Sequence, residues 1–322
     1  MTRVLNGMKA RIFLAAALAA TFCGALPARA ADAQLLALVM PGAKVVAGVN
    51  VDQAKATPFG MYVLGQIAPQ NQELQQLATL LGFDPRRDVS ELLMASTAAA
   101  GSTGLALARG TFDPAKIAAA ALQAGAKSES YNGINILEDP KQTSGVAFLG
   151  STVVVAGDVA SVKAAIDRQT APAKLSNTLS LQVNLWSQNE DAWVVVIGPP
   201  SLLKLAPGSP QVPGLGGQAG AFSAVQQIAG GVKFGTTVAL NAQAQTDTAL
   251  NATNMAGALQ FLANLAQMQT AQNPQAGGLL KALTVTAEGN TVNIGLSMSA
   301  EQFEQLAKPK PAAVRPRAAK KM

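Results

Sequence analysis

The sequence contains no histidine and only one cysteine, Cys23. Histidine is the general base of most serine and cysteine hydrolases and the commonest ligand of zinc, copper and haem, so its absence excludes sites built on it. Cys23 lies in a segment that we expect to be removed, which leaves the mature chain without a cysteine nucleophile or a disulfide. The mature protein must draw its stability from a packed core, and we expect it not to be an enzyme.

The first thirty residues have the pattern of a cleavable secretory signal peptide. Three basic residues precede an apolar run over residues 12–26, and the small-residue pattern 27–30 follows. The alternative, a transmembrane anchor, needs about 20 apolar residues, and no basic cluster follows this shorter run. We predict cleavage near Ala30/Ala31, a mature chain without a membrane span, and a location in the periplasm or outside the cell.

The net charge of +6 comes from the two ends of the chain. Without the signal peptide and residues 308–322, 14 basic residues remain against 18 acidic ones. The sequence predicts a disordered tail over 308–322 that contacts anionic polymers of the cell envelope and not nucleic acid. A solubilising end without a partner is the alternative. The expected polyanion contacts are Lys308, Lys310, Arg315, Arg317, Lys320 and Lys321.

The first half of the mature chain alternates strand and helix patterns. Asp113-Pro114 is typical of a helix start, Gly125 of a helix end, and Asp158 of a second helix start. Asn132-Gly133 between apolar stretches predicts a hairpin. The remaining expected elements are a strand over 44–51, a helix over 71–81, a strand over 104–108, and a hairpin with a two-residue turn at 150–151.

A similar order of elements recurs in the second half. We expect strands over 180–185, 192–197 and 236–244, a glycine- and proline-rich loop over 198–220, a helix over 252–269, a hairpin of 283–286 with 292–298, and a capping box at 299–302. These patterns predict an α+β fold with two tandem domains of antiparallel sheet, residues 31–175 and 176–307, each with helices on one face. That the two domains are a duplication is a hypothesis drawn from element order alone.

Several turn and cap phrases resemble uncharacterised exported bacterial proteins of the domain-of-unknown-function kind. The phrases are residues 109–114, Arg-Gly-Thr-Phe-Asp-Pro, then 131–134, Tyr-Asn-Gly-Ile, and the strand 146–149 with Ala-Gly-Asp at 156–158. The resemblance covers roughly residues 40–170. It implies no activity, and no functional residue is carried over from it.

Two groups of carboxylates are candidates for a binding or catalytic site. Asp84, Asp88 and Glu91 lie beside two arginines, a pattern typical of a surface ion-pair cluster with a helix cap. Glu190 and Asp191 lie between Trp186 and Trp193, the only tryptophans. Aromatic rings with carboxylates are typical of a sugar-stacking surface, whereas buried tryptophans of the core are the alternative interpretation.

We expect no metal and no cofactor. No segment has the alternating aspartates and distant glutamate of a calcium loop. Residues 214–219 formally fit a dinucleotide fingerprint, but they follow prolines where the fingerprint requires a strand, so we interpret them as a loop.

These observations favour an exported, non-enzymatic binding or structural module of the envelope, held near anionic components by its tail. The partner would be an anionic polymer or another envelope protein. Two alternatives remain open: a carboxylate-dependent glycan-active enzyme using Glu190 and Asp191, and an oligomeric structural subunit that assembles through sheet edges or the helix near Met268.

Overall fold

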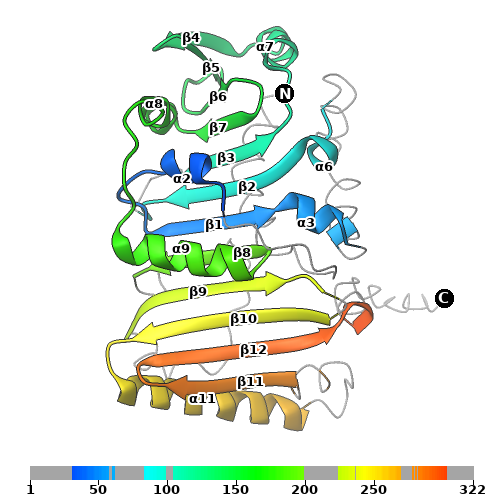
Figure 1. Ribbon diagram of the computed structural model, residues 1–322, viewed down its shortest axis with the longest axis vertical. Helices are drawn as coiled ribbons and strands as arrows, with labels where there is room; N and C mark the ends of the chain where they lie inside the picture. Colours follow the sequence, from blue (N-terminus) through cyan, green and yellow to red (C-terminus); the bar gives the residue numbers. More distant parts are fainter. Residues whose placement is uncertain are drawn as a thin grey trace, which may run out of the picture.

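The computed structural model describes residues 31–57, 60–61, 83–98, 104–198, 224–235, 237–269, 278, 280 and 282–302. The strands in these residues form one 12-stranded antiparallel sheet, in the order β11-β12-β10-β9-β8-β1-β2-β3-β7-β6-β5-β4 (Figure 1). The strands are β1 Val45–Asn50, β2 Val89–Ser96, β3 Leu105–Gly110, β4 Lys127–Tyr131, β5 Ile134–Glu138, β6 Gly145–Leu149, β7 Val153–Gly157, β8 Ala192–Ile197, β9 Val225–Lys233, β10 Thr237–Thr246, β11 Leu283–Glu288 and β12 Thr291–Ser299.

The two halves of the chain meet in the middle of this sheet. β1 pairs with β8 in antiparallel register, with Val46 opposite Val195 and Gly48 opposite Trp193. The expectation of a separate sheet in each half is therefore wrong: the apolar strands β1 and β8 bury their backbone edges against each other, since an unpaired edge leaves its N–H and C=O groups without partners. The predicted boundary near residue 175 falls between two helices, and as a boundary between domains it stays a prediction.

The order of elements repeats about this central pair. Moving outward from β1, the strands β2 and β3 are followed in the sheet by β7 and β6; moving outward from β8, β9 and β10 are followed by β12 and β11. In each half a helix follows the third strand along the chain: α7 follows β3, and α11 follows β10. The strands that come after this helix form the outer part of the sheet. The first half carries β5 and β4 in addition. The two halves thus share an order of elements within one continuous sheet, and a duplication stays a hypothesis.

Helices in the described residues lie on both faces of the sheet. They are α2 Ala33–Ala37, α3 Val51–Lys55, α6 Pro85–Asp88, α7 Pro114–Gln123, α8 Val159–Asp167, α9 Asn177–Asn189 and α11 Ala249–Gln269. The largest core cluster joins side chains of α2, α8 and α9 with one face of the sheet, among them Leu35, Val162 and Val183. By contrast, α11 packs through Ala252 and Met255 onto the opposite face of the second half. The expectation that helices cover only one face of the sheet is therefore wrong for the second half.

Most local expectations are confirmed. Asp113 accepts a hydrogen bond from the Lys116 N–H, and α7 ends at Gly125 with φ +89°. Asp158 caps α8, the hairpin at Asn132-Gly133 joins β4 to β5, and Ser299 and Gln302 exchange the two hydrogen bonds of a capping box. The hairpin after Leu149 forms too, with three residues between the paired ends Leu149 and Val153 in place of two.

One segment expected to be a strand is part of a helix in the structure. Residues 180–185, expected as a strand, belong to α9, in which Leu179, Val183 and Trp186 share the buried side. Their spacing of four and three residues is helical, and burial against the sheet outweighs the strand propensity of the segment. The helix expected over 71–81, the loop residues 199–220, the signal peptide and the basic tail lie outside the described residues. No helix within the described part of the chain is both long enough and apolar enough to span a membrane.

Candidate functional site

Glu190 and Asp191 lie at the junction between α9 and β8. Glu190 is the C-terminal cap of α9, and its N–H donates to the Trp186 carbonyl at 2.8 Å. The next residue enters the sheet, where the Asp191 N–H donates to the Val232 carbonyl at 3.0 Å. Both carboxyl groups are buried, with 6% and 4% of the residue exposed. The turn that was expected to be a candidate surface is thus an interior site between a helix and the sheet.

Asp191 has a full set of partners. Its Oδ1 pairs with the Lys233 ammonium at 3.0 Å, and its Oδ2 accepts from the Phe234 N–H at 2.7 Å. These contacts hold the end of β9 against the start of β8. Because a buried carboxylate needs both charge and hydrogen-bond partners, Asp191 has the environment of a structural ion pair.

Glu190 is only half satisfied. Its Oε1 accepts from the Asn241 amide at 2.8 Å, while its Oε2 is buried and has no hydrogen-bond partner among the described residues. The side chain lies on Gly231, where a Cβ atom would come within 2.5 Å of the Glu190 Cγ. Burial raises the pKa of Glu190 to about 7, the neighbouring Asp191 charge adds to the shift, and the Asn241 hydrogen bond and the Lys233 charge oppose it. Glu190 therefore exchanges its proton near neutral pH.

A polar face of the sheet continues from this site. Asn241 on β10 is paired with Gly231 on β9 and with Gly295 on β12, so its side chain and that of Glu190 lie on the same side. We give the name amide face to a group of uncharged polar side chains on this side: Asn241, Gln243, Gln245, Thr291, Asn293 and Ser297. Gln243 donates to Asn293 at 2.9 Å. In Figure 1, α9 runs across the neighbouring β8 while no labelled helix crosses β10 and β12. The amide face is thus rich in uncharged hydrogen-bonding groups, and the charged residues Lys233 and Glu288 lie at its margins on the same side of the sheet.

Neither tryptophan is exposed beside the amide face, although Trp193 is paired with Gly231 and points to the same side of the sheet. Trp186 projects from α9 and Trp193 from β8, each is only 6% exposed, and both are part of the largest core cluster. The Trp193 ring lies across Gly48, where a Cβ atom would meet it at 2.5 Å. The structure therefore agrees with the buried-core interpretation, and the expected sugar-stacking surface is not formed by these rings.

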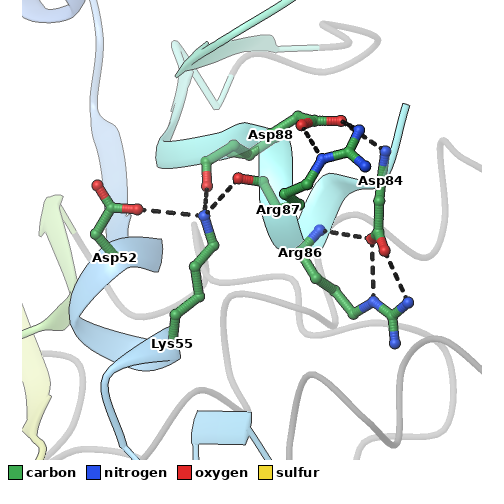
Figure 2. A network of polar contacts seen from close by, with 7 residues as sticks. Asp52, Lys55, Asp84, Arg86, Arg87 and Asp88 are labelled. Atoms are coloured by element: carbon green, nitrogen blue, oxygen red, sulfur yellow. Dashed lines mark hydrogen bonds and ion pairs between the residues drawn. The ribbon is translucent and has the colours of Figure 1, made fainter. Parts of the chain in front are cut away.

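The other acidic group is an ion-pair cluster, as expected. Arg86 pairs with Asp84 at 2.8 Å and Arg87 with Asp88 at 2.6 Å (Figure 2). Hydrogen bonds from Arg86 lower the pKa of Asp84. Lys55 extends the cluster to Asp52 at 3.2 Å and to the Arg87 carbonyl at 3.1 Å. These contacts tie α3 to the start of β2.

Glu91 is separate from that cluster. It faces the beginning of the described chain and accepts from the Asp32 N–H at 2.9 Å. Burial raises its pKa. Asp32 caps α2 and pairs with Arg109 at 2.6 Å; burial opposes the shift, but the bonds and charge of Arg109 lower the pKa of Asp32.

The geometry around Glu190 limits the chemistry of the site. A glycosidase needs two carboxyl groups about 5 to 10 Å apart across an open cleft. The carboxylate whose charge raises the pKa of Glu190 belongs to its chain neighbour Asp191. Asp191 accepts hydrogen bonds from the Lys233 ammonium and the Phe234 N–H. Within the described residues, no three His, Cys, Asp or Glu side chains are placed to hold a metal ion.

Sequence reasoning found Glu190 and Asp191 but missed their partners. Gly231, Lys233 and Asn241 are distant in the chain, and only the pairing of β8 with β9 and of β9 with β10 brings them to the site. The strand pattern of residues 236–244 was a partial signal, because it placed Asn241 and Gln243 on one face of a strand.

No family model and no curated protein matches this chain. Solved structures of TP0453 are similar to it. Crystal form III has a TM-score of 0.56 at 14% identity, over 86% of this chain and 98% of that one. Crystal form I has a TM-score of 0.51 at 14% identity, over 87% and 98%. At this identity the likeness shows the fold alone: a mixed α/β fold dominated by a large antiparallel sheet with helices.

Proposed function

We propose that this is an exported, non-enzymatic binding or structural module of the cell envelope, whose amide face contacts its partner. The observation that carries the proposal is the amide face itself, an array of uncharged hydrogen-bonding side chains flanked by Lys233 and Glu288 and beside the anchored pair Glu190 and Asp191. Uncharged amides and hydroxyls suit a partner rich in hydroxyl or amide groups, since they exchange hydrogen bonds with it at a small desolvation cost compared with charges.

Export is supported by the signal-peptide pattern and by the contacts at Ala31 and Asp32. Ala31 packs against the main core, and Asp32 caps α2 and pairs with Arg109. The first residues of the expected mature chain thus take part in the fold. We infer a mature protein in the periplasm or outside the cell, of the same uncharacterised exported kind that its turn phrases resemble.

The basic tail adds a second, electrostatic contact in this proposal. Its six lysines and arginines attract anionic envelope polymers over a distance of about 10 Å at 0.1 M salt. The tail then keeps the protein at an anionic layer while the amide face selects the partner, an anionic polymer or another envelope protein. Nucleic acid is not expected as a partner there.

A glycan-active enzyme is the second candidate, because a carboxyl with a pKa near 7 is what a general acid needs. The burial of Glu190 and the ion pairing of Asp191 count against it. Glycan hydrolysis screens with Glu190→Gln and Asp191→Asn variants test it: activity that both variants lose would replace the binding proposal.

The binding proposal is tested by pull-down from envelope extract at low and high salt. The bait is the mature chain, compared with a chain lacking residues 307–322 and with the double variant Gln243→Ala/Asn293→Ala. These two amides bond each other, so removing both leaves no buried orphan group. The matched control is Ser130→Ala/Asn135→Ala, an exposed cross-strand pair at the far end of the sheet.

We expect truncation to abolish the salt-sensitive part of capture and the Gln243/Asn293 variant to abolish the salt-resistant part. Capture that is the same for the mature chain and every variant would show that neither the tail nor the amide face binds the partner.

A further inference from the structure

The outer side of α11 carries an unusual share of exposed apolar side chains. Leu250 is 69% exposed, Phe261 60% and Met268 80%. They belong to a row with the alternating spacing of four and three residues that a helix-pairing seam requires. We call this row the α11 seam: Leu250, Asn254, Gly257, Phe261, Asn264 and Met268.

The seam faces away from the protein's own core. The inner side of α11 is buried through Ala252, Met255 and Ala256 against the sheet. Above Gly257, by contrast, a Cβ atom would meet nothing within 4 Å. The helix is therefore apolar on two sides, and the described part of the chain covers one of them.

We propose that two copies of the protein pair through α11 in antiparallel orientation. In such a pair, each seam position faces the complementary position of the partner helix. Leu250 then faces Met268, and the Phe261 ring faces the open space above Gly257. At each of these positions the two facing side chains are complementary in size, as a two-fold symmetric interface requires.

The two asparagines of the seam set the register of the helix pair. Asn254 faces Asn264 of the other copy, where two amides can exchange hydrogen bonds. A polar residue in an otherwise apolar seam specifies register at a cost in stability. A shift by one turn would bury each asparagine against an apolar side chain, so only one alignment satisfies all levels.

Charge favours a second copy as the occupant. No residue of α11 is charged, so two copies meet without repulsion and without desolvating an ion. A helix that lies on a membrane surface is typically rich in lysine and arginine on its polar side, which α11 is not. At the neighbouring sheet edge, Gln260 of α11 donates to the Val285 carbonyl of β11 at 2.8 Å.

The size of the seam predicts a weak dimer. A helix of 21 residues is about 31 Å long and about 10 Å wide, so the pair buries less than the roughly 800 Å² per partner of a standard interface. We expect association at micromolar to tens of micromolar concentration. The dimer is independent of the binding function proposed above.

Sedimentation velocity of the mature chain over a concentration series is the first test. We expect a monomer–dimer equilibrium, and Phe261→Glu should raise the dimer dissociation constant by at least about tenfold. Leu181→Glu is the matched control: Leu181 is 69% exposed, against 60% for Phe261, but lies on α9. A monomer at every concentration, or a dimer that Phe261→Glu does not weaken, would overturn the proposal.

Cysteine crosslinking tests the orientation, since the mature chain starting at Ala31 has no cysteine. A mixture of Leu250→Cys and Met268→Cys chains should form a disulfide-linked heterodimer. Leu250→Cys alone should not crosslink, because in an antiparallel pair its two copies lie about 27 Å apart. Crosslinking of Leu250→Cys alone would mean a parallel pair and contradict the model of the interface.

Discussion

At the scale of single residues, Glu190 shows how position decides the chemistry of a carboxyl group. Among the described residues its carboxyl group has one hydrogen-bond partner, Asn241, and its side chain lies on Gly231 between α9 and the sheet. Asp191, one residue later, has an ammonium and a backbone N–H. Two adjacent acids of the same type in the sequence thus have different environments, because the chain passes from helix to strand between them.

The raised pKa of Glu190 makes the free energy of unfolding depend on pH. Below its unfolded pKa of 4.5 the group is protonated in both states. Between 4.5 and about 7 the unfolded chain ionises while the folded one keeps its proton, so stability falls as pH rises. Glu190→Gln removes this loss, and we expect the variant to be more stable than the parent at pH 8 by about 1 to 3 kcal/mol.

Urea unfolding of both proteins at pH 4, 6 and 8 measures this difference. Glu288→Gln, at an exposed carboxyl on β11, is the matched control and should follow the parent at each pH. An unchanged pH slope in Glu190→Gln would show that Glu190 is ionised in the folded protein well below pH 7.

At the scale of elements, local sequence signals were reliable where a helix or hairpin end is determined by one or two residues. α7 is the clearest case: Asp113 caps its start, Pro114 occupies its first turn, and Gly125 ends it with a positive φ. α9 is the counter-example, since its leucines, valine and asparagines fit a strand or a helix and only burial on the sheet decides between them.

The cap of α7 is a test of this local determination. Asp113→Ala leaves the Lys116 N–H without its acceptor and should lower the free energy of unfolding by about 1 kcal/mol. Thr111→Ala, at an exposed position two residues earlier, should change it by less than about 0.5 kcal/mol. Chemical denaturation of the two variants measures both values. Equal effects would mean that the Asp113 bond does not contribute to stability.

At the scale of the whole molecule, the central pairing of β1 with β8 makes one sheet out of two similar halves. The largest core cluster crosses this junction: Leu179 and Val195 of the second half pack with Leu35 and Leu93 of the first. Each half therefore uses the other to bury an edge strand and a helix.

This dependence predicts that neither half folds well alone. A chain of residues 31–175 should lack cooperative unfolding, because it exposes the edge of β1 and loses the cover of α9. Mixed with residues 176–307, it should form a one-to-one complex in size-exclusion chromatography. The intact chain cut at a protease site inserted near residue 172 is the control and should stay assembled. Cooperative melting of residues 31–175 as a monomer would contradict this prediction.

The sequence by itself determined what depends on neighbours along the chain. The lack of histidine restricts the chemistry. Caps, turns and periodic apolar residues place most helices and hairpins, because each of these interactions spans only a few residues. Only the tertiary structure decided what depends on distant partners: the union of two blocks into one sheet, the burial of Trp186 and Trp193, and the meeting of Glu190 with Asn241. Strand pairing between distant segments is set by which edges and faces bury each other, and that information is not contained in any single stretch of the chain.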